Sequence, residues 1–438
     1  GAIIFDSGLA SVALDEVPTV DGYAAGRIKK TLGGSGLGFT VKDALEYARR
    51  RGVILYQIPY FQILKDFSEK VNDPSISKFA RMVNVMALSA SMSLLGFDKQ
   101  ILADAIRFVF RAKKKVADLN VSAAMQTYEY AEKFEKAGFY YSLQARPPAK
   151  DMIVVQGNQS SALGKMVAGC RFQTYYPITP ASDDSEFLES NEILDVNGTS
   201  KHEKGKGSTV VIQTEDEIAA ITMAIGGALT GARSATATSG PGFSLMAEAL
   251  GWAGINEVPV VVSLYQRAGP STGLPTRHEQ GDLHFAINAG HGEFPRIVMA
   301  SGDIEESFYD TVKAFNFAEK YQMPVIHMLD KAIANSVMTS KMLNPAVCTI
   351  ERGEILQTIT SDQKGVAGNY LRFKLSDNPI TPRVPLGTKD GIFWNTGDEH
   401  TEEGHITEDP EIRTRMMEKR MNKLDLALKE IPDNDKAV

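Results

Sequence analysis

Cysteine is scarce in this sequence, and its scarcity limits the chemistry that the chain can carry by itself. Two cysteines, Cys170 and Cys348, occur among 438 residues, and they lie far apart. Two cysteines cannot build a disulfide framework, and a cubane iron–sulfur cluster takes four thiolates. The chain alone therefore cannot hold such a cluster, and a reducing, cytoplasmic compartment fits this cysteine usage better than secretion does.

Basic excess and long apolar runs are also lacking. The formal net charge is −7, which argues against a nucleic-acid binder, because such proteins usually carry a basic face. The longest apolar-leaning run, 82–97, is interrupted by serine and asparagine and is shorter than the ~20 residues of a membrane span. What is present, 43% hydrophobic and 23% charged residues, is normal for a globular enzyme.

The length predicts two or three domains, and the first of them ends near residue 148. Val53–Tyr56 has the pattern of a short strand, while Ser77–Leu95 and Asp98–Phe110 carry apolar residues at helical spacing. Pro147 and Pro148 follow, and adjacent prolines stop a helix and stiffen a linker. The chain opens without methionine, directly on a strand-like segment, so we expect a fragment or a processed form.

From residue 149 to about 338, short apolar runs alternate with helical patterns. The runs are Met152–Val155, Gln173–Tyr176, Val210–Thr214, Ala235–Ser239, Val258–Leu264, Arg296–Ala300 and Val325–Leu329. The helical patterns are Ser160–Ala168, Ile218–Leu229, Leu245–Ala253 and Glu305–Lys320. This alternation predicts an α/β fold with a mostly parallel sheet and helices on both of its faces.

The last hundred residues, 339–438, have the composition of a connector. Asn378–Pro385 is rich in proline, and Glu408–Lys429 is a highly charged helix candidate. Several acidic and histidine residues precede or open that helix: Glu399, His400, His405, Glu408 and Asp409. Because no tight His/Cys spacing supports a metal site, a solvated surface is the favoured interpretation of this set.

Polar or glycine-rich stretches follow four of the predicted strands. They are 176–180, 215–217, 239–242 and 266–276. Each has a structural explanation of its own: the prolines at 177 and 180 shape a turn, glutamates at 215 and 217 suit a helix start, glycines at 240 and 242 turn the chain, and Arg267 pairs with a carboxylate. The carboxyl ends of parallel strands meet at one edge, so the four stretches together predict a site there.

These stretches resemble a known family. Tyr176-Pro177-Ile178-Thr179-Pro180 is similar to the signature of 2-oxoacid:ferredoxin oxidoreductase α subunits, and Thr238–Gly242 resembles a turn in the pyrimidine-binding domains of thiamine-diphosphate enzymes. Gln266–Thr276, the following Glu279–Asp282 and the Glu399–Asp409 segment also resemble the family. Residues 1–148 resemble the γ domain fused ahead of α in the two-subunit archaeal type. Compared with that family, both ends look truncated.

The resemblance implies a domain plan and roles for particular residues. Residues 1–148 would be a partial γ domain, 149–338 the thiamine-diphosphate pyrimidine-binding (PYR) domain, and 339–438 a linker leading to a missing C-terminal α/β domain. Glu217 would be the catalytic glutamate on the cofactor's pyrimidine, with Glu215 in reserve. The residues implied to bind substrate are Thr179, Arg267 and Thr276, and those implied to bind cofactor are Glu217, Ser239 and Gly240.

The resemblance also implies what the chain must obtain from others. No Gly-Asp-Gly with a distant Asn is present, so Mg²⁺, the diphosphate contacts and the [4Fe-4S] cluster are expected on a β subunit. The implied reaction is coenzyme A-dependent oxidative decarboxylation of 2-oxoacids such as pyruvate and 2-oxoglutarate, with electrons passed to ferredoxin. Open alternatives are a thiamine-diphosphate decarboxylase or acetolactate-synthase-like enzyme, a lipoamide-dependent dehydrogenase component, and a non-catalytic assembly subunit of the same fold.

Overall fold

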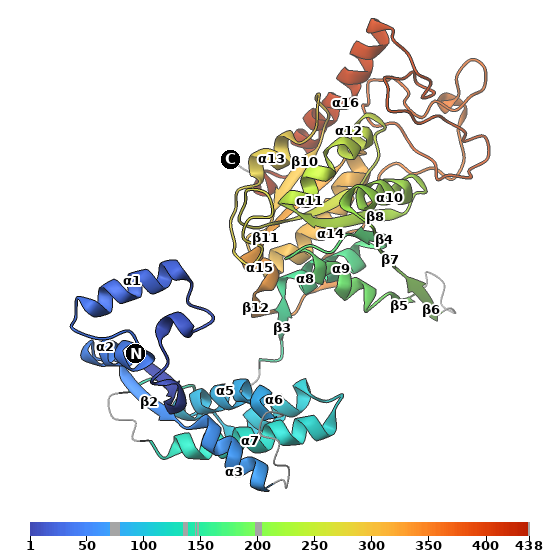
Figure 1. Cartoon of the computed structure of the whole chain (residues 1–438). Coiled ribbons are helices and arrows are strands. Elements are labelled where there is room, and N and C mark those ends of the chain that lie inside the picture. Colours follow the sequence, from blue (N-terminus) through green and yellow to red (C-terminus); the bar gives the residue numbers. More distant parts are fainter. Residues whose placement is uncertain (71–78, 135–138, 145, 147–148, 198–203, 437–438) are drawn as a thin grey trace. The chain divides into compact units, whose positions relative to one another are not determined.

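The computed structural model describes residues 1–70, 79–134, 139–144, 146, 149–197 and 204–436. The chain forms two compact units, Gly1–Pro148 and Ala149–Val438, which are described separately (Figure 1). The two prolines that we expected to mark a boundary, at 147 and 148, lie outside the described residues. No helix of the described part is long and apolar enough to cross a membrane.

The first unit combines a two-stranded parallel sheet with a group of helices. Strand β1 (Ala2–Asp6) pairs with β2 (Ile54–Ile58), which is the strand expected near 53–56. The helices are α1 (Gly22–Gly33), α2 (Val41–Arg50), α3 (Tyr60–Lys70), α5 (Val83–Leu94), α6 (Lys99–Val109) and α7 (Lys114–Glu132). The helix expected over 77–95 begins at Val83, after a 3₁₀ turn at 80–82; residues 77 and 78 lie outside the described ranges.

The second unit is built on a six-stranded sheet in which every neighbouring pair is parallel. Its strands, in spatial order, are β10 (Ile297–Ala300), β11 (Val325–Asp330), β9 (Val261–Gln266), β8 (Arg233–Ser239), β4 (Cys170–Tyr175) and β7 (Val210–Gln213). The predicted parallel sheet is therefore confirmed. Six of the seven predicted runs form it, which places their carboxyl ends along one edge.

One predicted strand does not belong to this sheet. Met152–Val155 falls in β3 (Met152–Gln156), which pairs antiparallel with β12 (Val337–Lys341), so its expected membership of the parallel sheet was wrong. The partner β12 has the mixed sequence VMTSK and is mostly exposed, and its apolar pattern is too weak to predict a strand. A short apolar run identifies a strand but not the segment with which that strand pairs.

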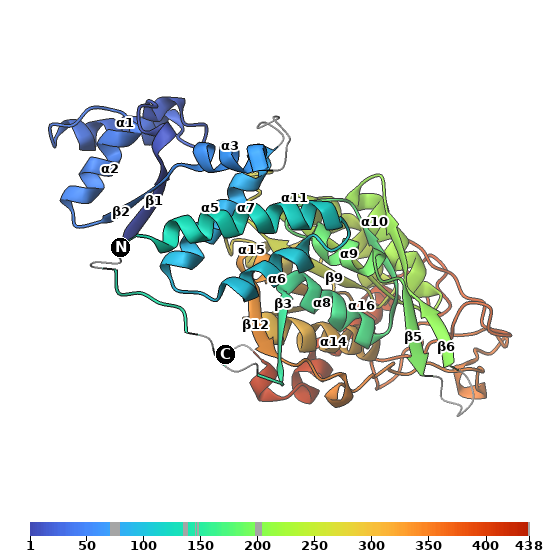
Figure 2. The ribbon, with the colours of Figure 1, turned by 90° about the horizontal axis from the view of Figure 1, so that it is seen from below.

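A second pair of strands was not predicted. β5 (Ile193–Asn197) and β6 (Lys204–Ser208) form an antiparallel hairpin between α9 (Ser182–Glu189) and β7. In both views this hairpin extends from the body of the second unit (Figures 1 and 2). The sequence KGKGS of β6 has no apolar side chain, so periodicity could not indicate a strand there.

Helices cover both faces of the six-stranded sheet, as expected. On one face, Val262 and Leu264 of β9 pack in a core with α10 (Glu217–Leu229), α11 (Gly240–Leu245), α12 (Ala247–Ile255) and α13 (Leu283–Asn288). On the other face, the neighbouring Val261 packs with the end of α8 (Gly157–Ala168) and with α14 (Ile304–Tyr321). Successive residues of a strand point to opposite faces, so β9 is buried on both sides.

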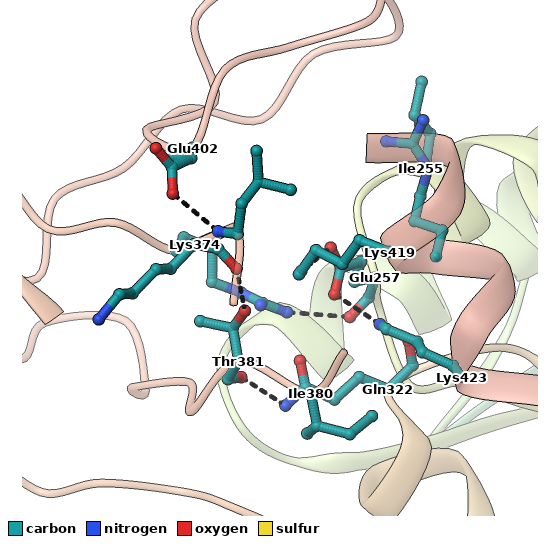
Figure 3. Close-up of polar contacts among 12 residues, drawn as sticks. Ile255, Glu257, Gln322, Lys374, Ile380, Thr381, Glu402, Lys419 and Lys423 are labelled. Atoms are coloured by element: carbon teal, nitrogen blue, oxygen red, sulfur yellow. Dashed lines mark hydrogen bonds and ion pairs between the residues drawn. The ribbon is translucent and has the colours of Figure 1, made fainter. Parts of the chain in front are cut away.

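Helix α16 (Pro410–Glu430) is held against this body by buried charges (Figure 3). Lys419 Nζ and Lys423 Nζ each lie 2.5 Å from a different carboxylate oxygen of Glu257, and Arg372 donates to the Glu257 carbonyl at 3.0 Å. All four residues are buried. We call this group the Glu257 cluster. The hundred residues expected to act as a connector therefore pack within the same compact unit as the sheet.

The solvated surface expected for the 399–409 set is confirmed for His405, Glu408 and Asp409, which are exposed, but it is wrong for His400. The His400 ring is fully buried, with one ring nitrogen 3.1 Å from the carbonyl of Ile255. Glu399 accepts bonds from Arg413 and Arg420, both at 2.6 Å. Charge density in the sequence suggested exposure, but two arginines of α16 pair with the Glu399 carboxylate, and its side chain is 10% exposed.

Candidate functional site

The four stretches predicted to meet do follow four adjacent strands. Spatial order places β9, β8, β4 and β7 side by side, and each of the stretches follows the carboxyl end of one of them. Because all four strands run parallel, their ends lie along the same edge of the sheet. We call the groups at this edge the strand-end site.

Glu217 is the first residue of α10 and is 6% exposed. Asp216 caps the helix by accepting the N–H of Ala219 at 2.6 Å, and Thr174 of β4 fixes the helix by donating to the carbonyl of Ala220 at 2.6 Å. Burial raises the pKa of Glu217, with a smaller contribution from Asp216. Glu215 is exposed. Of the two glutamates considered, Glu217 is the buried one, and a buried carboxyl with a raised pKa is suited to proton transfer.

Gly242 allows the Glu217 carboxyl to lie against the turn after β8. A Cβ added at Gly242 would lie 2.2 Å from the hydroxyl oxygen of Thr238 and 2.5 Å from Glu217 Oε1. Both distances are far below contact distance, so only glycine permits this approach. The glycine turn is therefore part of the construction of the strand-end site, because it lets the backbone of 240–242 pack directly on the carboxyl group.

Arg267 and Thr179 are brought together. The guanidinium follows β9, is 7% exposed, and donates from Nη1 to the carbonyl oxygen of Thr179 at 2.6 Å. Its Nε is buried and has no hydrogen-bond partner among the described residues. Burial lowers the pKa of Arg267, and the charge of Asp282 acts in the opposite direction. The Nη1 group of Arg267 thus holds the 176–180 loop, whereas its Nε donor has no partner among the described residues.

Two further groups near this edge lack partners. The hydroxyl of Ser239, at the end of β8, is fully buried and makes no hydrogen bond within the described chain. The Oδ2 atom of Asp282 is also buried and has no hydrogen-bond partner within the described chain. Burial raises the pKa of this carboxyl. Buried polar atoms without partners are rare and costly in native structures. Several of them at one edge, with the open Nε of Arg267, are the features expected of a binding site.

The positions of Thr276 and Gly240, the other residues predicted from the sequence, give less evidence of a binding role. Thr276 is exposed in the loop between Ala268 and Gln280, which folds back through a bond from the Leu274 N–H to the Ala268 carbonyl at 3.0 Å. Gly240 opens α11 directly against Asp282. Asp282 itself received no role from the sequence. Its only signal was its place in the Glu279–Asp282 segment of the family pattern.

Another hollow of this unit lies away from the strand-end site. A cavity of ≈ 890 Å³ is lined by Lys320, Arg352 and Glu430, among others. Lys320 pairs with Glu430 at 2.9 Å, and Arg352 pairs with Glu319 at 2.6 Å. Its cations are therefore satisfied by the protein, unlike the groups of the strand-end site. No group of three or more His, Cys, Asp or Glu residues that could hold a metal ion occurs in the described ranges.

Two family models match the chain. Residues 163–419 match "Pyruvate flavodoxin/ferredoxin oxidoreductase, thiamine diP-bdg", and residues 1–130 match "Pyruvate ferredoxin/flavodoxin oxidoreductase". The first match includes the whole strand-end site. The domain described as binding thiamine diphosphate is thus the one that carries Glu217, Ser239 and Arg267.

Individual relatives agree with these models. The 2-oxoacid:ferredoxin oxidoreductase 1 α subunit of Sulfurisphaera tokodaii is 44% identical over 99% of this chain and 67% of its own length, and the α subunit of Saccharolobus solfataricus is 44% identical with the same coverage. A solved structure, the 2-oxoglutarate:ferredoxin oxidoreductase of Magnetococcus marinus with 2-oxoglutarate, coenzyme A and succinyl-CoA bound, has a TM-score of 0.72 at 33% identity, covering 87% of this chain and 62% of that one.

This chain spans about two thirds of the length of these curated relatives. Within that span, the family models, the curated relatives and the solved structure all indicate the same family. The chain belongs to the α-subunit family of the 2-oxoacid:ferredoxin oxidoreductases.

Proposed function

We propose that this chain is the thiamine-diphosphate-contacting part of an enzyme that oxidatively decarboxylates 2-oxoacids, with coenzyme A as acyl acceptor and ferredoxin as electron acceptor. The observation that carries the proposal is the buried carboxyl of Glu217 against the glycine turn, at the same sheet edge as the open guanidinium of Arg267. A proton-exchanging carboxyl beside an anion-binding arginine is what a 2-oxoacid and a thiamine pyrimidine together require.

The residues present fit the pyrimidine part of thiamine diphosphate. Glu217 supplies a carboxyl that burial keeps easy to protonate, and the Ser239 hydroxyl is a buried polar atom without a partner. When bound, thiamine diphosphate supplies a nucleophilic carbon and an electron sink. Glu217 would exchange a proton with a pyrimidine nitrogen through its carboxyl oxygens, and the 240–242 turn would hold the ring close to that carboxyl.

Arg267 and Thr179 would bind the substrate's carboxylate. The Nη1 group of Arg267 is committed to the Thr179 carbonyl at 2.6 Å, which fixes the plane of the guanidinium. The buried Nε then offers a donor of fixed direction, and a charge-assisted bond to a carboxylate would satisfy it. Thr276, in the exposed loop after Arg267, would contribute its hydroxyl to this polar cradle.

The remaining parts of the reaction are assigned to a β subunit. The described residues hold no candidate metal cluster, and the sequence has two cysteines, so we place Mg²⁺, the diphosphate contacts and the [4Fe-4S] cluster on that partner. The PYR domain at 149–338 and the partial γ domain at 1–148 retain the roles that the family pattern implies. A cytoplasmic location is proposed because both cysteines are free thiols, as in a reducing compartment.

The test is reconstitution with a β subunit and measurement of ferredoxin or dye reduction. Glu217→Gln keeps the size of the side chain but removes the exchangeable carboxyl proton, so turnover should fall by about 100-fold or more. Glu215→Gln is the matched control, because its carboxyl is exposed two residues away, and its turnover should stay near that of the wild type.

Two results would contradict this proposal. If Glu217→Gln retains wild-type turnover in a complex that oxidises 2-oxoacids, Glu217 is structural and the non-catalytic alternative gains support. If the isolated chain binds thiamine diphosphate tightly with Mg²⁺ in calorimetry, the division of the cofactor between two chains is wrong.

A further inference from the structure

Two consecutive carbonyl groups of the 176–180 loop accept hydrogen bonds from buried side chains. The carbonyl of Thr179 accepts from Arg267 Nη1 at 2.6 Å, and the next carbonyl, that of Pro180, accepts from Asn158 Nδ2 at 2.8 Å. Arg267 is 7% exposed, and Asn158 is fully buried. The loop is therefore held at two adjacent peptide groups, but the proposed function gives a role to only one of the two donors.

Asn158 donates this bond from a helix that is closely fixed to its neighbours. It is the second residue of α8, and a Cβ added to the preceding Gly157 would lie 2.1 Å from the carbonyl oxygen of Ile333. Only glycine permits so close an approach. Two residues further along α8, the hydroxyl of Ser160 donates to the carbonyl of Ile304 at 2.6 Å. The start of α8 is therefore a rigid support from which the Asn158 amide reaches the loop.

The helix that follows the loop is fixed as well. Asp184, in the first turn of α9, pairs with Lys165 of α8 at 2.7 Å and accepts a bond from the hydroxyl of Tyr265 at 3.0 Å. All three residues are fully buried, and α8 and α9 lie side by side in both views (Figures 1 and 2). The start of α9 is thus tied to α8 and to the end of β9, whereas Asn158 holds the loop itself.

The position of Thr179 depends on these bonds to the loop. Its own carbonyl is bound by Arg267, and the carbonyl of the next residue is bound by Asn158. A hydroxyl makes a good hydrogen bond only over a narrow range of distance and angle. A small shift of the backbone at Thr179 would therefore weaken the bond that its hydroxyl is proposed to make with the substrate.

We propose that Asn158 is a positioning residue for the 2-oxoacid: its bond to the Pro180 carbonyl holds Thr179 where the threonine hydroxyl meets the substrate's carboxylate. This inference rests on the proposed function of the strand-end site, and it adds a residue to which that function gives no role. Asn158 acts without contacting the substrate, so its whole effect on substrate binding must pass through the 176–180 loop.

The expected defect of a variant without this amide is weaker substrate binding. The Pro180 carbonyl loses its donor, the loop can shift, and the bond from Thr179 is weakened or lost. A neutral hydrogen bond contributes about 1 kcal/mol, which corresponds to about fivefold in a binding constant. The KM for pyruvate should therefore rise about fivefold, with kcat changed less than about twofold, because the lost interaction is one of binding. The affinity for thiamine diphosphate should stay unchanged.

The experiment is a double-mutant cycle in the reconstituted αβ complex, with dye reduction measured over a range of pyruvate concentrations. Asn158→Ala should raise the KM about fivefold when Thr179 is present. In the Thr179→Ala background it should raise the KM less than about twofold, since the hydroxyl that Asn158 positions is already absent. If the two effects multiply, or if Asn158→Ala keeps the wild-type KM, the inference is wrong.

Asn256 supplies a matched control away from the strand-end site. It is also buried, and its Nδ2 donates to the carbonyl of Thr396 at 2.8 Å. Its Oδ1, like that of Asn158, has no hydrogen-bond partner among the described residues. Asn256→Ala should therefore lower stability in urea unfolding by a similar amount but change the KM less than about twofold. An equal rise in KM for both variants would show general destabilisation and overturn the inference.

Asn158→Ser provides a second variant if the alanine variant does not assemble. The serine hydroxyl keeps a polar group at this position but is too short to replace the amide at Pro180, so the same rise in KM is expected. A normal KM in this variant, in a complex whose wild type oxidises 2-oxoacids, would overturn the inference and leave the proposed function standing. A wild-type complex that oxidises no 2-oxoacid would overturn the proposed function and the inference with it.

Discussion

Glu257 and Glu217 are buried glutamates of the same unit, yet their carboxylates have opposite surroundings. Burial alone would raise the pKa of Glu257, but Lys419, Lys423 and Arg372 together hold it well below the usual range (Figure 3). Glu217 has no cation among the causes of its shift, and burial raises its pKa. Three cations therefore stabilise the ionised form of Glu257. No cation of the described residues does so for Glu217, so its carboxyl can exchange a proton more readily.

The arginines of this unit show the same contrast between a side chain that is paired with an opposite charge and one that is not. Three arginines meet at Glu319: Arg233, Arg352 and Arg383 pair with it at 2.8, 2.6 and 2.7 Å. Arg267 instead donates to a carbonyl, and no carboxylate of the described residues pairs with its charge within 4.0 Å. Satisfied groups indicate a structural role and open ones a binding role. Activity and stability measurements can test this distinction separately.

The largest expected effect is on stability, from Glu257→Gln. The variant leaves the lysines of α16 buried without their counter-charge, and breaking a buried ion pair in this way costs about 3–5 kcal/mol. Urea unfolding followed by tryptophan fluorescence will measure it, because both tryptophans, Trp252 and Trp394, lie in this unit. The exposed Glu418 of α16 supplies the control Glu418→Gln; an equal small loss in both variants would refute a structural role for the cluster.

The next effect is on catalytic efficiency, from Arg267→Ala. If the guanidinium binds the substrate's carboxylate, its removal should lower kcat/KM by the equivalent of about 2–5 kcal/mol. Arg267→Lys should recover part of this loss, since an ammonium is charged but lacks the planar fork. Thr179→Ala should cost about 0.5–1.5 kcal/mol, because the carbonyl that Arg267 holds belongs to the backbone and is kept. Near-normal efficiency of Arg267→Ala on several 2-oxoacids would make Arg267 structural.

The smallest effect concerns pH and has opposite signs at the two glutamates. The pKa of Glu217 is raised in the folded state, so the wild type should lose stability relative to Glu217→Gln as the pH rises above the ordinary value of 4.5. The pKa of Glu257 is lowered, so the stability that it contributes should be present above pH 4.5 and be lost as the pH falls below it. Unfolding of the wild type, Glu217→Gln and Glu257→Gln from about pH 2 to pH 7 measures both slopes, the first above and the second below pH 4.5. Slopes of the same sign at the two glutamates would contradict the distinction.

Much of the strand-end site could be predicted because its information is local. Short sequence patterns of a strand, a turn or a helix start are enough to show that four stretches follow strands: 176–180, 215–217, 239–242 and 266–276. Parallel pairing then brings these strand ends together. The choice between Glu215 and Glu217 needed the structure, since only the start of α10 determines which side chain is buried. The substrate roles of Thr179, Arg267 and Thr276 remain predictions.

Other features could not be predicted because their partners are distant in sequence. Glu257 meets Lys419 and Lys423 across about 160 residues, and β3 pairs with β12 across about 180. Hydrophobic periodicity reports which face of an element is buried but not what it is buried against. The same limit explains why His400, in a charged stretch, was expected at the surface but is buried.

The sequence by itself determined the alternation of strands and helices, the parallel sheet that this alternation requires, and the residue types that follow each strand. Only the tertiary structure decided which of those residues have partners. His400 shows the difference: it lies in a charged stretch that predicts exposure, but its ring is buried, with one ring nitrogen 3.1 Å from the carbonyl of Ile255. The physical reason is that local backbone preferences are worth about 1 kcal/mol, which burial and charge can readily exceed.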